Sequence, residues 1–136
     1  MDADSEGRAR RFTSRRLCAL AALLLALATA IGALAAHGLK GRLGVEQAAV
    51  LQTAVQYQFF NALGLLALGG LIERWPRRAL RAAGALLAVG LVLFSGSLYL
   101  LLAGAPVMLG VLTPIGGVAL ILGWLLAAVA LWTGPP

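Results

Sequence analysis

Long apolar runs alternate with short polar segments along the chain, and this pattern dominates the sequence. The apolar runs cover about residues 17–39, 47–72, 82–102 and 107–132. Each is long enough to cross a bilayer, because a spanning helix needs about 20 residues at a rise of about 1.5 Å per residue. The segments between them are short and rich in Gly, Pro and Arg. The pattern predicts an all-α fold, a four-helix antiparallel transmembrane bundle, within a membrane domain at 17–136.

The first apolar run has a second interpretation as a secretory signal, because basic residues precede it and small residues are frequent near its end. The triplet Arg10-Arg11-Phe12 faintly imitates a twin-arginine signal. However, the run exceeds the usual signal core of about 7–15 residues. Further membrane segments follow it, rather than a domain for export. We therefore interpret 17–39 as the first membrane helix.

The polar ends and loops predict the orientation. Residues 1–16 lack the apolar content of a folded core, which predicts a disordered cytoplasmic tail. Basic residues of the tail and of the loop between the second and third runs would share one side of the membrane: Arg8, Arg10, Arg11, Arg15, Arg16, Arg74, Arg77, Arg78 and Arg81. The opposite side has only Lys40 and Arg42. Because Lys and Arg accumulate in cytoplasmic loops, both termini are expected in the cytoplasm. Gly134, Pro135 and Pro136 are expected to end the last helix.

Composition excludes a soluble domain. The chain of 136 residues is 61% hydrophobic and 12% charged, whereas soluble proteins have roughly a quarter of their residues charged. A small soluble domain has too little interior to bury so much apolar surface. The net charge of +6 does not indicate nucleic-acid binding, because the basic residues flank apolar runs. Membrane lipids are the expected partners, and nucleic acid is not.

The first half of the second run is unusually polar. Gln52 and Gln56 share one helix face at i,i+4 spacing, and Tyr57 and Asn61 share another. This half has an alternative placement in the membrane interface. The second half alone is too short to span, so one tilted helix over both halves is favoured. Amides inside a span must then find partners, because an unpaired polar group in hydrocarbon costs several kcal/mol.

Polar residues of all four predicted spans are candidates for a common polar site. They are His37, Gln52, Gln56, Tyr57, Asn61, Ser95, Ser97, Tyr99 and Thr113. Two interpretations stay open for them: hydrogen bonds between helices, or a pocket for a small ligand or lipid headgroup. The single histidine is interpreted either as a proton acceptor near neutral pH or as a residue that bonds to a neighbouring carbonyl or lies in the headgroup zone.

Small residues predict close helix packing. Ala28, Gly32 and Ala36 recur at every fourth position of the first run. Two further pairs, Gly90 with Ser97 and Gly116 with Gly123, lie two turns apart. In lipid, helix association depends on such small residues and on hydrogen bonds between helices.

The last run contains a predicted kink at Pro114, Gly116 and Gly117. The proline would free the carbonyl of Gly110, which a neighbour or water must then satisfy. Broken helices recur at transporter binding sites, although kinked helices are common in membrane bundles.

Reactive groups are absent from the predicted spans. There is no acidic residue in them, no nucleophile paired with a base, and no glycine loop that would bind phosphate. One histidine and one cysteine cannot make a metal site or an internal disulfide. We therefore expect no enzyme activity, no cofactor and no metal.

Four segments together resemble one family. They are residues 32–39 (GALAAHGL), 52–58 (QTAVQYQ), 93–99 (LFSGSLY), and 113–117 (TPIGG) followed by Gly123-Trp124. These segments resemble the YgdD-like bacterial inner-membrane proteins, a family of unknown function (domain of unknown function 423, UPF0382 type). The resemblance implies a four-helix protein of the bacterial inner (plasma) membrane and supplies no activity. Family members typically have histidine where this chain has Asn61, which favours a hydrogen-bonding role that asparagine can share.

Two functional hypotheses follow from these patterns. The leading one is a noncatalytic membrane protein that forms a homo-oligomer or serves as an accessory subunit of a membrane-protein partner. The alternative is a small-solute or lipid-binding carrier that uses the polar residues and the kink. A closed core in which these side chains bond to one another would argue against the carrier.

Overall fold

The fold consists of four long antiparallel α-helices. The computed structural model describes the backbone of residues 3–39 and 41–133 and the side chains of residues 14–39 and 41–133. The helices are α1 (Ala3–His37), α2 (Val45–Arg74), α3 (Arg78–Leu102) and α4 (Leu112–Trp132), with a short 3₁₀ helix η1 (Val107–Val111) before α4. No strand occurs in the described part. Predictions that concern residues 1–2, Lys40 and residues 134–136 lie outside it.

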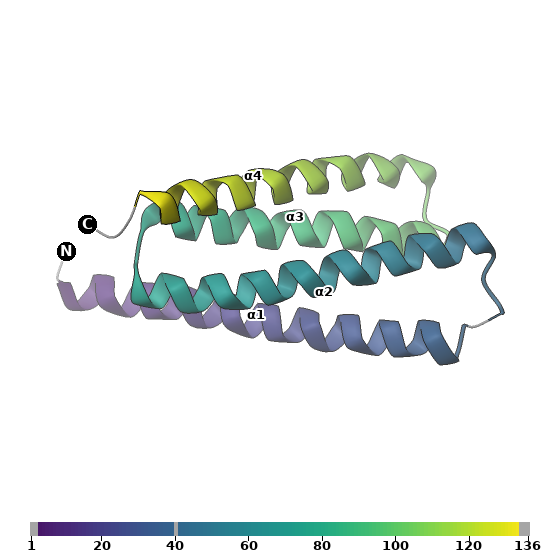
Figure 1. Ribbon diagram of the computed structural model, residues 1–136, viewed down its shortest axis with the longest axis horizontal. Helices are drawn as coiled ribbons and strands as arrows, with labels where there is room; N and C mark the ends of the chain where they lie inside the picture. Colours follow the sequence, from purple (N-terminus) through teal and green to yellow (C-terminus); the bar gives the residue numbers. More distant parts are fainter. Residues whose placement is uncertain (1–2, 40, 134–136) are drawn as a thin grey trace.

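All four helices are long and apolar enough to cross a membrane. The candidate spans are Ser14–His37, Val45–Arg74, Arg78–Leu102 and Val107–Trp132. The predicted all-α, four-helix antiparallel class is therefore confirmed. Helix α1 packs against α2, α2 against α3, and α3 against α4, so that α1 and α4 lie on opposite sides of the α2–α3 pair (Figure 1). Helix α1 begins and α4 ends at the same end of the bundle (Figure 1).

The structure differs from the expected disordered tail at residues 1–16. Helix α1 begins at Ala3 and runs through this segment without a break. Alanine and arginine are good helix formers. At the end of the segment Ser14 is buried, and its hydroxyl donates to the carbonyl oxygen of Gly69 at 2.6 Å. A contact with α2 thus fixes the helix before the apolar run starts.

Buried positions follow a seven-residue pattern along the helices. On α2 the buried positions at alternating spacings of three and four are Leu51, Ala54, Gln58, Asn61, Leu65, Leu68 and Ile72. On α4 they are Gly116, Leu120, Gly123, Ala127 and Ala130. On α1 the buried residues lie seven apart, at Ser14, Ala21 and Ala28. Such spacing keeps one seam of a helix against its neighbour, as in coiled coils and most helix bundles.

Helices α3 and α4 approach each other through glycine. A Cβ atom built on Gly116 would overlap the backbone nitrogen of Phe94 and lie 2.8 Å from the carbonyl oxygen of Gly90. At Gly123 a Cβ atom would lie 2.9 Å from the Leu87 side chain. The two backbones therefore touch at a point where no larger residue fits.

The small-residue stripe of α1 contacts α2 over only part of its length. Ala28 is buried, and a Cβ atom on Gly32 would meet Val55 Cγ1 at 3.4 Å, an ordinary contact distance. Ala36, one turn further, is exposed. The contact between α1 and α2 therefore weakens toward the loop that joins them.

In place of the predicted kink within one helix, the structure has a short 3₁₀ helix followed by an α-helix. The chain forms the 3₁₀ helix Val107–Val111, and α4 begins at Leu112. Pro114 therefore lies in the first turn of α4, where a missing N–H breaks no helical hydrogen bond. The proline marks the start of an α-helix rather than a bend within one.

Arg77 joins the α2–α3 turn to the end of α4. Its Nη1 atom donates to the carbonyl oxygen of Ala130 and to Oγ1 of Thr133, both at 2.8 Å. The last carbonyls of a helix lack partners within the helix and carry partial negative charge. Arg77 therefore has a structural role in addition to its place among the orienting charges.

Adjacent glycines allow the α3–α4 contact to be tested. We expect Gly116→Ala to lower the free energy of unfolding by about 1–3 kcal/mol, because the new methyl group must displace backbone. Gly117→Ala is the matched control, since its Cβ atom would meet only Phe94 ring carbons, at 3.6 Å or more. The measurement is unfolding in detergent followed by circular dichroism. Equal effects of the two substitutions would contradict the proposed contact.

Candidate functional site

Gln58 lies at the centre of the polar interior. It is only 2% exposed. Its Nε2 atom donates to the carbonyl oxygen of Leu24 on α1 at 2.8 Å. Its Oε1 atom accepts from the hydroxyl of Tyr99 on α3 at 2.7 Å. One amide therefore links three helices.

Asn61, one turn further along α2, connects this helix to α4. Its Oδ1 atom accepts from the indole Nε1 of Trp124 at 2.9 Å. Its Nδ2 atom donates to the carbonyl oxygen of Tyr57 at 2.9 Å. The indole also lies against Gly64, where a Cβ atom would overlap the ring. Asn61 thus bonds to the indole of Trp124, and Gly64 leaves room for its ring.

Serines of α3 complete the network. The hydroxyl of Ser95 donates to the carbonyl oxygen of Ala54 on α2 at 3.0 Å. Ser97 Oγ lies 2.7 Å from Thr113 Oγ1 on α4, and donates to the carbonyl oxygen of Phe94 at 2.9 Å. We define the polar core as Gln58, Asn61, Ser95, Ser97, Tyr99, Thr113 and Trp124.

The polar core uses its hydrogen-bonding groups internally. In the part of the chain with described side chains, no buried nitrogen or oxygen atom of a side chain lacks a partner. An unpaired polar group in a nonpolar interior is expensive, so this pairing stabilises one helix arrangement. Asn61, Ser95, Ser97, Tyr99 and Thr113 each have a hydrogen-bond partner within the protein, as the hydrogen-bonding interpretation expects.

The other candidate residues lie apart from the polar core. His37 is exposed at the end of α1, where its Nδ1 atom donates to the carbonyl oxygen of Ala33 at 3.1 Å. Tyr57 is 47% exposed and stacks on Phe94, with ring centroids 4.6 Å apart. Gln52 and Gln56 are exposed on a different face of α2.

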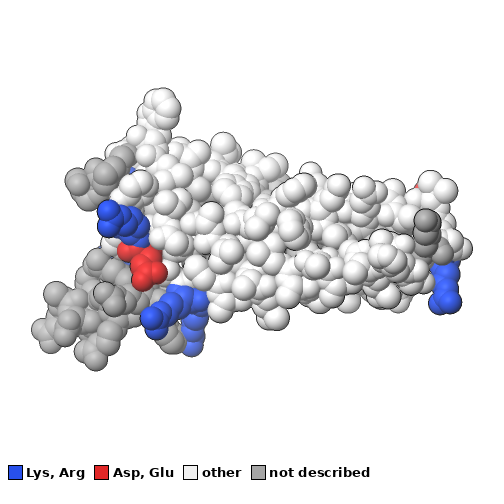
Figure 2. Space-filling model, turned by 60° about the horizontal axis from the view of Figure 1, so that its bottom comes forward, with Lys and Arg blue, Asp and Glu red and all other residues white. Residues whose placement is uncertain are grey.

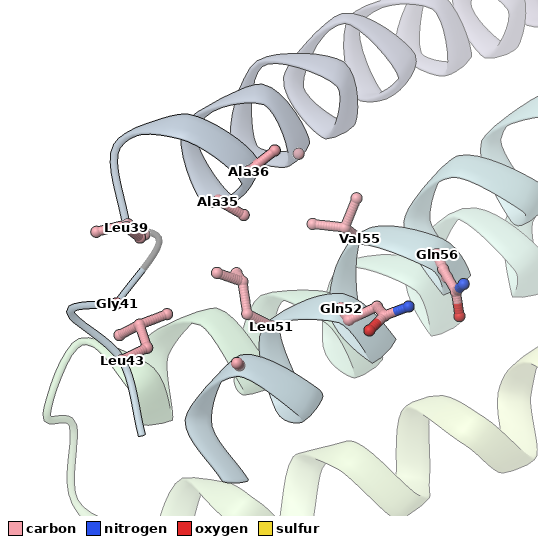
Figure 3. Close-up of a pocket in the computed structure, with 11 residues that line it drawn as sticks. Ala35, Ala36, Leu39, Gly41, Leu43, Leu51, Gln52, Val55 and Gln56 are labelled. Atoms are coloured by element: carbon pink, nitrogen blue, oxygen red, sulfur yellow. The ribbon is translucent and has the colours of Figure 1, made fainter. Parts of the chain in front are cut away.

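A cavity of about 570 Å³ lies between α1, α2 and the loop that joins them. Its lining residues are Gly32, Ala35, Ala36, Leu39, Gly41, Leu43, Ala48, Leu51, Gln52, Val55 and Gln56. Figure 3 shows Leu51 and Val55 on the side of α2 that faces α1, with Gln52 and Gln56 along the α2 edge of the cavity. Five residues of the predicted polar set (Asn61, Ser95, Ser97, Tyr99 and Thr113) thus belong to the polar core, Gln52 and Gln56 line the cavity, and His37 and Tyr57 belong to neither.

Sequence reasoning missed Gln58 and Trp124 as site residues. The signal that identifies Gln58 is its place on the seven-residue pattern of α2, between Ala54 and Asn61, whereas Gln52 and Gln56 fall outside that pattern. Trp124 lies beside Gly123, which faces α3, but nothing in the sequence indicates that its indole reaches Asn61.

Groups for metal or acid–base chemistry do not gather in the described part of the chain. No cluster of three or more His, Cys, Asp or Glu side chains occurs there. The chemistry of the core is therefore hydrogen bonding among uncharged groups, and the chemistry of the cavity is an apolar wall with two amides.

Comparison with known proteins identifies the family. The family described as "Protein of unknown function (DUF423)" matches residues 31–117, more than half of the chain. The chain belongs to this family. The DUF423 match includes the whole cavity lining and most of the polar core.

The similarity to known relatives extends over most of both chains. The UPF0382 membrane protein YwdK of Bacillus subtilis is 41% identical over 82% of this chain and 91% of the relative. A UPF0382 membrane protein of Staphylococcus epidermidis is 42% identical over 82% and 90%. The UPF0382 inner membrane protein YgdD of Escherichia coli is 36% identical over 86% and 89%. These names describe membrane proteins without a stated activity, and no solved structure matches the chain.

Two tyrosines provide a test of the polar core. We expect Tyr99→Phe to lower the free energy of unfolding by about 1–2 kcal/mol, because Gln58 Oε1 loses its donor in a buried site. Tyr57→Phe removes the same atom from an exposed ring and should change stability little. Both variants can be compared with the parent protein by thermal unfolding in detergent. A loss confined to Tyr57→Phe would contradict the role assigned to Tyr99.

Proposed function

We propose that this DUF423 protein is a noncatalytic membrane protein that works by associating within the bilayer, with copies of itself or as an accessory subunit. The closed polar core is the observation that carries the proposal. Every buried polar side-chain atom in the described part has an internal partner. A carrier needs free polar groups along a path, and an enzyme needs reactive ones. We therefore assign the function to contacts that the outer surface makes within the bilayer.

The exposed face of α1 supports association. Ala22, Ala26 and Ala30 lie at every fourth position and are exposed, whereas Ala21 and Ala28 are buried against the bundle. Helices in lipid approach closely where small residues recur at this spacing. Because α1 packs mainly against α2, this alanine face is free for another helix.

We also propose that both termini lie in the cytoplasm. Basic side chains gather at one end of the bundle (Figure 2), the end where α1 starts and the α2–α3 turn lies. Arg42 lies in the α1–α2 loop, at the opposite end. The described arginines at the first end are Arg15, Arg16, Arg74, Arg77, Arg78 and Arg81. Loops rich in Lys and Arg remain on the cytoplasmic side.

Association is tested by adding bulk to the alanine face. We expect Ala26→Leu to weaken self-association about fivefold or more, since extra side-chain bulk in a close contact costs about 1–3 kcal/mol. Ala128→Leu adds the same bulk to an exposed position of α4 and is the control. Subunit number is counted by single-molecule photobleaching in nanodiscs or native membranes. A parent protein that is strictly monomeric and copurifies with no membrane protein would contradict the proposal.

Orientation is tested with two acidic positions, which leaves the Lys and Arg distribution unchanged. In a Cys18→Ala background, Glu46→Cys should react with a membrane-impermeant maleimide added to the periplasmic side of intact cells. Glu73→Cys should react only after the inner membrane is opened, because it lies at the arginine-rich end. Both side chains are exposed, so both variants should react in detergent. The reverse pattern would show that the termini face outward.

A further inference from the structure

We propose that the cavity between α1 and α2 binds an anionic glycerophospholipid, with the phosphate at Arg42 and the ester groups at Gln52 and Gln56. The cavity forms because the two helices separate beyond the contact of Gly32 with Val55. Toward the loop they leave a space bordered by Leu39, Gly41 and Leu43 (Figure 3). Its volume of about 570 Å³ is within the roughly 300–1,000 Å³ of small-molecule sites.

The two amides at the edge of the cavity are exposed and have no hydrogen-bond partner among the described protein groups. Gln52 and Gln56 lie one turn apart and both line the space. Gln58 bonds to Leu24 and Tyr99, but no protein group in the described part bonds to the side chains of Gln52 and Gln56. An amide near the hydrocarbon gains from an acceptor, and the ester carbonyls of a glycerolipid are acceptors.

The depth of these amides matches the level of lipid ester groups. A hydrocarbon thickness of about 30 Å corresponds to about 20 helical residues. Counting back from Glu73, near the arginine-rich end of α2, reaches about Thr53 at the other boundary. Gln52 and Gln56 therefore straddle the boundary between hydrocarbon and headgroups. Beyond them toward α1 lie Leu51, Val55 and Ala36, which form an apolar wall for the upper part of an acyl chain.

Charge in the loop that borders the cavity favours an anionic headgroup. Arg42 is exposed and lies between Gly41 and Leu43, which both line the cavity. No ion pair with Arg42 occurs among the described side chains, and Glu46 is the one described acidic residue at this end. A guanidinium group presents a planar fork of donors that suits a phosphate.

The same charge disfavours a second copy of the chain in this cavity. A twofold interface with its axis near this end of the cavity would bring the two Arg42 side chains close to each other. Like charges repel at short distance unless a counterion lies between them. A lipid phosphate supplies that negative charge without a second protein.

Native mass spectrometry of the full chain in detergent tests the site. The protein is titrated separately with dioleoylphosphatidylglycerol, which is anionic, and dioleoylphosphatidylcholine, which is zwitterionic. We expect one phosphatidylglycerol to bind several-fold more tightly than phosphatidylcholine. The double variant Gln52→Leu/Gln56→Leu should bind it about tenfold more weakly, as two lost hydrogen bonds imply. Arg42→Gln should remove the preference for phosphatidylglycerol.

Matched controls separate this site from general lipid contact. Thr53→Val removes a hydroxyl that bonds to Ala49 on the same helix and lies outside the cavity lining. Arg78→Gln removes an exposed charge at the opposite end of the bundle. Both controls should bind phosphatidylglycerol as the parent protein does. Because Arg42 is exposed and outside the helices, Arg42→Gln should retain the parent circular dichroism spectrum and provides a readout that does not depend on refolding α2.

Two results would overturn the proposal. The first is equal binding of both lipids by the parent protein and all variants, which would indicate lipid that only surrounds the bundle. The second is a parent dimer that is lost in the Gln52→Leu/Gln56→Leu variant while lipid binding is unchanged, which would place a second copy in the cavity. Loss of dimer in Ala26→Leu with unchanged phosphatidylglycerol binding would support a lipid site independent of association.

Discussion

The requirement that polar groups in hydrocarbon find partners accounts for the arrangement of the four helices. Water is absent from the bilayer interior, so each amide or hydroxyl there must bond to protein or lipid. Gln58 meets the requirement by joining α1 to α3, and Asn61 meets it by receiving the indole N–H of Trp124. Helices made only of leucine and alanine would pack in several alternative ways. These bonds select one arrangement, because the alternatives leave buried amides unpaired.

Close packing of small residues makes these hydrogen bonds geometrically possible. Ala21 and Ala28 are buried on either side of Leu24, whose carbonyl oxygen accepts from the Gln58 amide. Small buried residues let helices in lipid approach closely. On the other side of the bundle, Gly116 brings α4 onto the backbone of α3, near the point where Thr113 reaches Ser97. Small residues and polar side chains therefore act together, since each hydrogen bond requires a short distance between helix axes.

Helix periodicity separates the interior of α2 from its cavity-facing edge. Gln58 and Asn61 lie on the seam with Ala54 and Leu65, and their groups are used within the protein. Gln52 and Gln56 are also amides, but they lie on another face of α2, beside the cavity between α1 and α2. The polar segment at residues 52–61 thus contributes side chains both to the polar core and to the surface. The interior amides therefore stabilise the helix arrangement, whereas the amides beside the cavity remain available to a ligand.

The sequence by itself determined the helical class, the number of spans and the family, because these depend on the length and apolar content of each run and on motifs such as residues 52–58 and 113–117. It also indicated which residues are polar inside the membrane. Tertiary structure decided which of these residues meet, since Leu24, Gln58 and Tyr99 come from three helices whose adjacency no local pattern specifies. It also decided that Pro114 lies in the first turn of α4, because the preceding 3₁₀ segment shifts the start of that helix to Leu112.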